Sequence, residues 1–267
     1  MSSRVDDVIS ATRDALNRYF GTAAGASLLR HLQIGLGISR AQIETGCLHY
    51  TLDSFESDNA IYADVATHIA MWIEYQNAQG IHARRQALVL HELQQALPRA
   101  IADIGFGAPT RYVRDYVLAS PGVVVDLLDK YPAAIEVGRS LLDYFGAGSQ
   151  GAVRFGLHDM DVDPPVEDRD CYLLLDSIEH AADPTRYLRA TISVARPRAL
   201  FLFHLPIGPL IPSHSMAWEN DRDARLWLES LGLNVDRTEF NSPNPQVDLF
   251  AGNEVKLKDL FVVARKR

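Results

Sequence analysis

The stretch Arg99-Ala-Ile-Ala-Asp-Ile-Gly-Phe-Gly107 decides the fold of this chain. Residues 100–104 form an apolar run that carries Asp103 near its end, and Gly105 and Gly107 follow directly. Glycine lets the backbone approach a ligand closely, because any side chain there would hold the ligand away. A strand, a glycine turn and a helix are how an α/β sheet presents backbone N–H groups to a nucleotide-like ligand at its carboxyl edge. The stretch therefore predicts a ligand site at the end of a first strand.

Strand-like and helix-like runs alternate after residue 99. Repeated β-α units of this kind predict a mostly parallel sheet with helices on both faces. The last two strands have no good helix between them, so we expect them to form an antiparallel pair at one edge, with Ser242-Pro-Asn-Pro in their connecting loop. The expected strands are 100–104, 123–128, 153–157, 172–175, 200–204, 234–239 and 260–264, and the expected helices are 110–119, 132–145, 184–194 and 218–231. The fold class is thus α/β, with a Rossmann-like, seven-stranded, mostly parallel sheet.

The segment before Pro98 has a different pattern and predicts helices alone. Apolar residues recur at helical spacing, and few alternating runs occur. The expected helices are 5–20, 26–34, 39–45, 58–76 and 81–97. We therefore expect two domains, an all-helical cap over residues 1–97 and the α/β domain over residues 98–267.

Composition disfavours several classes of protein. The net charge of −8 disfavours non-specific binding of nucleic acid, which needs a basic face. The two cysteines, Cys47 and Cys171, belong to no paired-cysteine motif, which fits a reducing compartment. The N-terminus lacks the pattern of a signal peptide, and no uncharged apolar run is long enough to span a membrane. We expect a cytoplasmic protein that binds neither nucleic acid nor membrane.

Acidic residues recur at the ends of the later strands. Asp129 ends the second strand just before a helix that begins at Pro132, where a carboxylate can bind ribose hydroxyls. The third strand leads into Asp159-Met160, where the carboxylate can accept a hydrogen bond from an adenine amino group and the methionine can cover the ring. The fourth strand ends in Leu175-Asp-Ser-Ile-Glu-His180. Each element of a nucleotide site is therefore present, in order.

This order resembles the class I S-adenosylmethionine-dependent methyltransferases, over residues 99–267. The motifs that carry the resemblance are Asp103-Ile-Gly-Phe-Gly, Leu-Leu-Asp129, His-Asp159-Met and Leu-Leu-Asp-Ser-Ile-Glu-His180 before Asp-Pro. Ala108-Pro109 departs from the family, which usually places a further glycine here. The resemblance implies S-adenosylmethionine as cofactor. By the same resemblance, the methionine part would contact Asp103, Gly105 and Gly107, the ribose Asp129, the adenine Asp159 and Met160, and the sulfonium Asp176 and Ser177. Ile104, Phe106 and Lys130 are further residues expected to bind the cofactor.

A nicotinamide dinucleotide is the main alternative cofactor. Its fingerprint also opens with Gly-x-Gly, but it requires a third glycine at position 110, which is Thr110. The sequence therefore favours S-adenosylmethionine.

Three histidines are candidates for a general base: His180, His204 and His214. A base is needed only where the methyl acceptor must lose a proton, and histidine titrates near neutral pH. Each also has a structural interpretation, as a helix cap, a core residue and a loop residue respectively. A metal is a further alternative, since Asp176, Glu179 and His180 are close in sequence and His204 or His214 could join them as ligands of Mg²⁺, Mn²⁺ or Fe²⁺. The Glu-His pair is also common in family members without a metal. We therefore expect S-adenosylmethionine as the cofactor and no metal ion.

Aromatic residues of the cap are candidates for a substrate wall, although most aromatics of an amphipathic helix pack in a core. The candidates are Tyr50, Tyr62, Trp72, Tyr75 and, in the α/β domain, Trp218. Arg84-Arg85 is interpreted as a solvated helix face, and the histidines of the cap, His68 included, show no ligand-like spacing.

Together, these features predict S-adenosylmethionine-dependent methyl transfer to a small molecule. The acceptor atom, oxygen, nitrogen or carbon, stays open. A second hypothesis is a non-catalytic protein that binds the cofactor and uses the cap for dimerisation or partner contact, and a homodimer is possible under either hypothesis. A third is methyl transfer to a protein or to RNA.

Overall fold

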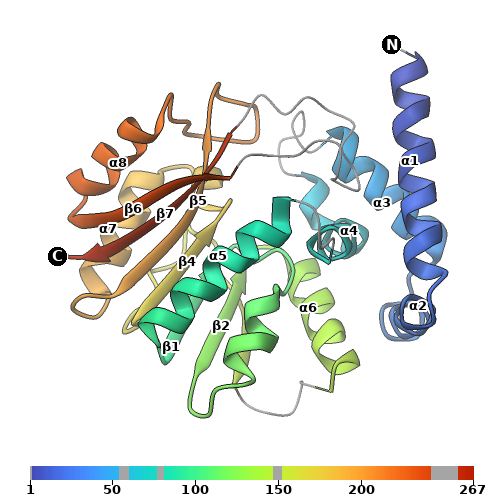
Figure 1. The fold of residues 1–267 in the computed structure, drawn as a ribbon, viewed down its shortest axis with the longest axis horizontal. Coiled ribbons are helices and arrows are strands. Elements are labelled where there is room, and N and C mark those ends of the chain that lie inside the picture. Colours follow the sequence, from blue (N-terminus) through green and yellow to red (C-terminus); the bar gives the residue numbers. More distant parts are fainter. Residues whose placement is uncertain (1, 54–59, 77–80, 147–151, 242–257) are drawn as a thin grey trace.

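The computed structural model describes residues 2–53, 60–76, 81–146, 152–241 and 258–267. Within them, seven strands form one sheet in the order β3-β2-β1-β4-β5-β7-β6 (Figure 1). The first five strands pair in parallel, and β7 lies antiparallel between β5 and β6. The predicted fold class and the antiparallel pair at one edge are confirmed. The strands are β1 (Ala100–Ile104), β2 (Val124–Asp129), β3 (Val153–Leu157), β4 (Cys171–Leu175), β5 (Leu200–Ile207), β6 (Leu233–Asn241) and β7 (Lys258–Lys266).

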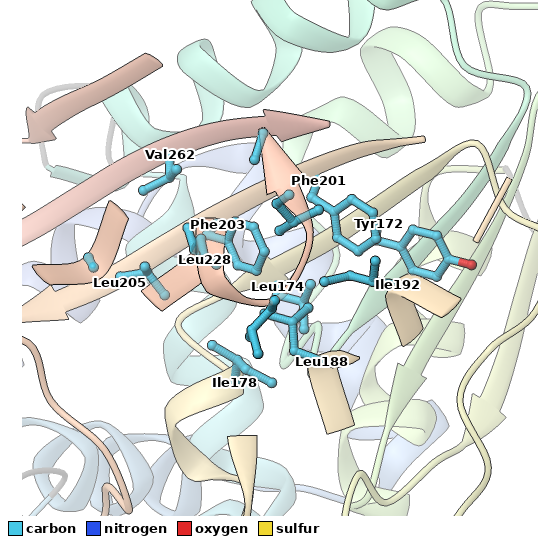
Figure 2. Packing of buried hydrophobic residues seen from close by; sticks show 14 of the residues in the cluster. Tyr172, Leu174, Ile178, Leu188, Ile192, Phe201, Phe203, Leu205, Leu228 and Val262 are labelled. Atoms are coloured by element: carbon cyan, nitrogen blue, oxygen red, sulfur yellow. The ribbon is translucent and has the colours of Figure 1, made fainter. Parts of the chain in front are cut away.

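The central strands are buried on both faces, which is why they read as continuous apolar runs. Successive side chains of β4 point to opposite faces, so that Tyr172 and Leu174 join one core and Cys171 and Leu173 the other. Figure 2 shows the first core, where the Tyr172 ring stacks on Phe201 with centroids 4.8 Å apart. Helices α7 (Pro184–Val194) and α8 (Asp221–Ser230) close this core.

The opposite face is covered by α5 (Ile81–Ala96), the π-helical turn Val113–Val117 and α6 (Pro132–Tyr144). The predicted helix 110–119 is therefore wound more widely than an α-helix over Val113–Val117. Although α5 precedes the sheet in sequence, Val89 and Leu93 pack in the sheet core.

The remaining N-terminal helices form a third core that α6 shares through Val137 and Leu141. They are α1 (Ser2–Phe20), α2 (Ala23–Leu36), α3 (Arg40–Asp53), a short 3₁₀ helix η1 (Ala60–Ala63) and α4 (Val65–Tyr75). In Figure 1, α1 to α3 stand beside the sheet rather than over it. No helix in the described part of the chain combines the length and apolar character needed to cross a membrane.

Three predicted helices have bounds clearly other than expected. The helix expected over residues 39–45 continues to Asp53 at the end of α3, and two others begin later than expected. The expected continuous helix 58–76 breaks at Asp64, whose extended backbone and side chain cap α4 by accepting from the Ala66 N–H; Asp58 lies outside the described residues. The expected helix 218–231 starts at Asp221, because Asn220 is the cap and Trp218 pairs with Ile207 as an isolated bridge. The Ser242-Pro-Asn-Pro stretch also lies outside the described residues.

Candidate functional site

The glycine turn after β1 adopts a conformation that side chains disfavour. Gly105 and Gly107 have φ values of +73° and +59°, in the left-handed region where glycine is tolerated best. A Cβ at Gly105 would lie 2.6 Å from the Cβ of Ser177, and one at Gly107 would collide with the methyl of Met71 in α4. Gly105 therefore leaves no room for a side chain, whereas at Gly107 the positive φ is the main obstacle, because the end of the Met71 side chain can move. The turn is a narrow strip of backbone, which we call the backbone ledge, between the end of β4 and the cap.

Two buried carboxylates flank this ledge. The Oδ2 of Asp103 accepts a hydrogen bond from the Tyr112 hydroxyl at 2.6 Å, while its Oδ1 is buried without a hydrogen-bond partner. Burial raises the pKa of Asp103 to about 7, although the Tyr112 hydrogen bond opposes the shift. Asp129 accepts from the N–H groups of Gly107 and Tyr131, each at 3.0 Å. Asp129 thus fixes the glycine turn to the end of β2.

The other residues predicted for the cofactor take more varied positions. Asp159 accepts from the Asp161 N–H at 3.0 Å within a local turn, and Met160 packs against the first core. The side chains of Ile104 and Phe106 are buried in the two sheet cores, which leaves only their backbone groups for a ligand.

Lys130, between β2 and α6, is exposed, and its Nζ lies 5.1 Å from the centroid of the Tyr131 ring. Ser177, in the turn after β4, is buried, and its Oγ has no hydrogen-bond partner.

Arg85 lies at the centre of the first charged cluster, and its interpretation as a solvated residue is wrong. Its guanidinium forms ion pairs with Asp176 and with Asp259 of β7, the latter at 2.7 Å. Arg84, its neighbour, is exposed and pairs with Glu239, as expected for a surface residue. Burial by itself would lower the pKa of Arg85, but the neighbouring carboxylates of Asp176 and Asp259 outweigh burial and raise it. The α5 helix turns only one of the two arginines inward.

His204 belongs to the same cluster, which we call the Arg85 cluster (Arg85, Asp176, His204 and Asp259). His204 lies within β5, buried, and its ring is 5.2 Å from that of Phe261. Burial lowers the pKa of His204 to about 4. Asp176 adopts a φ of +53° as the chain leaves β4, a conformation uncommon outside glycine. Ligand atoms of Asp176, His204 and Asp259 lie within 4.8 Å of one another, with the guanidinium of Arg85 bound to both carboxylates.

A second cluster, the His214 cluster, consists of Glu179, His180 and His214. Glu179 and His180 lie in the 3₁₀ turn Ile178–His180 after β4, and His214 lies in the loop after β5. The two imidazole rings meet edge to face with centroids 4.8 Å apart. Burial lowers the pKa of both histidines, that of His214 to about 3, and raises the pKa of Glu179 well above its ordinary range.

The cap contributes side chains to the same edge of the sheet. Tyr62 of η1 lies between Tyr131 and His180, with ring centroids 6.0 and 6.3 Å away. The two ring nitrogens of His68 lie 2.8 Å from the Gly107 carbonyl oxygen and 2.7 Å from that of Tyr62. His68 therefore joins the cap to the glycine turn, a role that its place in the sequence does not reveal.

The other aromatic candidates divide between the site and the cores. Tyr75 lies near the glycine turn, its hydroxyl 4.0 Å from where a Cβ of Gly107 would be. Tyr50 packs against the cap core. Trp72 is buried in that core, and Trp218 is buried in the first sheet core against Trp227. Arg85, Asp259 and His68 are the residues at this edge that sequence reasoning missed, since none belongs to a motif.

Comparison with known proteins adds evidence about the fold. The sequence matches no family model, and no curated protein matches it. Among solved structures, the [4+2]-cyclase SpnF is similar over 88% of this chain and 95% of its own, with 14% identity and a TM-score of 0.57. Magnesium protoporphyrin IX methyltransferase from Synechocystis PCC 6803, with bound S-adenosylmethionine, is similar over 85% and 97%, with 15% identity and a TM-score of 0.52.

Human N-acetylserotonin methyltransferase, also in complex with S-adenosylmethionine, is similar over 94% of this chain and 70% of its own, with 14% identity and a TM-score of 0.50. Identities this low inform on the fold alone. The strand order, the glycine turn after β1 and these structural neighbours agree that the chain has the fold of the class I S-adenosylmethionine-dependent methyltransferases.

Proposed function

We propose that this protein transfers a methyl group from S-adenosylmethionine to a small-molecule acceptor. The observation that carries the proposal is the backbone ledge at Gly105 and Gly107, which lies between the buried carboxylates of Asp103 and Asp129. A ledge of this kind, at the carboxyl edge of a parallel sheet, suits a ligand that is polar at one end and carries a nucleoside at the other.

The residues present fit this cofactor. Two polar atoms, Asp103 Oδ1 and Ser177 Oγ, are buried beside the glycine turn without a hydrogen-bond partner, and such atoms are costly to leave unpaired. The ammonium group of the methionine part would satisfy an acceptor such as Asp103. Asp129 has both oxygens engaged with backbone N–H groups, but each oxygen can accept a second hydrogen bond, here from the ribose.

The remaining roles follow the resemblance. Asp159 and Met160 would border the adenine, Lys130 the ribose, and Asp176 the sulfonium; Ile104 and Phe106 would take part through their backbone. Bound S-adenosylmethionine supplies the methyl group and a good leaving group. The protein therefore needs mainly to align the acceptor and exclude water.

The acceptor would lie between the sheet edge and the cap. Tyr62 and Tyr75 offer aromatic surface there, and the histidines offer groups that hold or move a proton. Of these, His180 is half-buried beside Tyr62, whereas His204 is buried in β5 with a pKa of about 4. The net charge of −8 favours a small molecule over nucleic acid. A cytoplasmic location and a possible homodimer stay predictions.

Calorimetry with S-adenosylmethionine and S-adenosylhomocysteine tests the cofactor. We expect saturable binding of both and none of NAD. Gly107→Ala should abolish binding, because its Cβ enters the ledge at a positive φ. Gly122→Ala is a matched control: its φ is +80°, but its Cβ meets nothing within 4 Å. Failure of the wild-type protein to bind either ligand would overturn the proposal.

A second candidate is a protein that binds the cofactor without transferring its methyl group. The similarity to SpnF supports this second candidate, because SpnF is named as a [4+2]-cyclase and yet shares this fold. A fold does not fix a function. Release of S-adenosylhomocysteine in the presence of a panel of phenols, amines and carboxylic acids supports the transferase. Tight binding of S-adenosylmethionine with no such release for any acceptor supports the second candidate.

A further inference from the structure

The His214 cluster brings together three side chains that are typical metal ligands. One ligand atom from each of Glu179, His180 and His214 lies within 4.8 Å of the other two. Glu179 and His180 are neighbours in sequence, whereas His214 comes from the loop that follows the next strand. The Ser215 N–H and hydroxyl donate to the Glu179 carbonyl oxygen at 2.8 and 3.1 Å. The two segments are therefore fixed to each other by Ser215 and by the contacts of His180 with the Ser213 carbonyl and the His214 ring.

Each of the three side chains has an atom available for a ligand. The Oε2 of Glu179, a residue 1% exposed, and the Nδ1 of His214 are both buried without a hydrogen-bond partner. His180 Nδ1 lies 2.8 Å from the carbonyl oxygen of Ser213. A carbonyl only accepts, so Nδ1 carries the proton and Nε2 keeps its lone pair. Donation from the second ring nitrogen to a carbonyl is the usual way in which proteins orient a metal-binding histidine.

The Arg85 cluster shows why the His214 cluster is the better candidate. Both clusters combine carboxylate and imidazole groups at the same edge of the sheet. In the Arg85 cluster, the guanidinium already binds both carboxylates. Within the described residues, Glu179 has no ion pair. A buried carboxylate without a paired cation is the costly arrangement that a bound cation corrects.

We propose that Glu179, His180 and His214 bind a divalent transition-metal ion, with Zn²⁺ or Fe²⁺ favoured over Mg²⁺. Two imidazoles and one carboxylate suit zinc, iron and their neighbours, whereas Mg²⁺ prefers oxygen ligands alone. Tetrahedral Zn²⁺ with bonds of about 2.1 Å holds its ligand atoms about 3.4 Å apart, so the three side chains would need to move toward one another to bind it. Three protein ligands leave coordination positions open for water or for a small oxygen ligand.

This proposal stands apart from the proposed methyl transfer, since it concerns metal binding alone. It changes one expectation: an imidazole that binds a metal through its free nitrogen cannot also accept a proton there. With the metal bound, His180 and His214 would hold the ion in place and would not act as general bases.

Calorimetry of the full-length protein, first stripped with a chelator, tests the proposal with Zn²⁺ and Mg²⁺ as separate probes and no other ligand. We expect one Zn²⁺ per chain and no Mg²⁺ binding. Glu179→Gln and His214→Gln each remove a proposed ligand, so each should weaken Zn²⁺ binding by more than the roughly 10- to 100-fold that loss of a residue orienting a ligand costs. His91→Gln, at an exposed histidine of α5, and Asp176→Asn, in the Arg85 cluster, should leave it unchanged. Absence of Zn²⁺ binding, or equal binding by Glu179→Gln and the wild type, overturns the proposal.

A second experiment, which looks for a new absorption band, tests the proposal even if these variants fold poorly. Co²⁺ bound to His214→Cys should show a thiolate-to-metal charge-transfer band that wild-type protein with Co²⁺ lacks. Absence of the band in the folded variant also overturns the proposal. Binding of S-adenosylmethionine, measured separately, shows whether the proposed function stands or fails on its own.

Discussion

The Arg85 cluster and the His214 cluster both combine carboxylate and imidazole groups, yet among the described residues only the first includes a cationic side chain, Arg85. Arg85 reaches Asp176 and Asp259 from a helix that precedes the sheet in sequence. Glu179, three residues after Asp176, has two histidines for neighbours instead. Similar groups at one edge of a sheet can therefore have different roles, one structural and one in ligand binding. The first cluster fixes the structure, and the second is left for a ligand.

The strongest test of this comparison removes the cation. Arg85→Met leaves two carboxylates together without their partner, and loss of one member of a buried ion pair costs about 3–5 kcal/mol. Urea unfolding should show this loss of stability. Arg84→Met is the matched control, because the exposed Arg84–Glu239 pair contributes only about 0.2–1 kcal/mol. Equal effects of the two substitutions would contradict the central role of Arg85.

Adding a metal ion should stabilise the protein through the His214 cluster, whereas removing Arg85 destabilises it through the Arg85 cluster. Zn²⁺ at 100 times its dissociation constant should stabilise the wild-type protein by about 2.7 kcal/mol. Asp176→Asn should retain this gain and Glu179→Gln should lose it. Thermal unfolding with and without Zn²⁺ measures the difference. A gain that survives in Glu179→Gln would place the ion elsewhere.

Asp103 is a third acid at this edge, and it predicts a pH dependence. Its unfolded pKa is about 3.9, whereas burial raises the folded pKa to about 7. Between these values the folded protein holds a proton that the unfolded chain has lost, so stability falls as pH rises. We expect a loss of roughly 2 kcal/mol between pH 5 and pH 7.

Asp103→Asn should flatten this part of the stability profile, whereas Asp143→Asn, at an exposed carboxylate of α6, should not. Denaturant unfolding at several pH values gives the profiles. A slope that Asp103→Asn leaves unchanged would assign the pH dependence to other groups.

The smallest expected effect concerns His68, which connects helix α4 of the cap to the glycine turn after β1. His68→Leu removes both contacts to the carbonyl oxygens of Gly107 and Tyr62, which should cost about 1–3 kcal/mol. Affinity for S-adenosylmethionine should fall as well, because the glycine turn loses its support from α4. Exposed His49, replaced by Gln, provides the control for calorimetry and unfolding. An unchanged stability would show that the cap does not hold the turn.

Most of the fold could be predicted from local patterns. The runs of apolar residues gave all seven strands, and Pro98 and Pro132 mark a helix end and a helix start as expected. Two of the errors arose where a side chain caps a helix. Asp64 and Asn220 accept backbone N–H groups and so begin helices later than the apolar period suggests.

The candidate site could be predicted only in part. Asp129 ends β2, and Gly105, Gly107 and Glu179 lie in the turns that follow β1 and β4, so a parallel sheet must bring all four to one edge. Arg85 could not be found in this way, because in sequence it is one of two adjacent arginines on a helix. Only the packing of α5 on the sheet decides which of the two faces Asp176.

The order of strands and helices, the glycine turn and the acids at the strand ends follow from the amino-acid sequence alone. These features depend on neighbours within a few residues, through apolar periodicity, glycine conformation and capping. The tertiary structure alone decided which charges meet. Arg85 pairs with Asp259, 174 residues away, and His180 meets His214 from another loop. Contacts of that kind arise from the packing of helices on the sheet, and no local pattern encodes them.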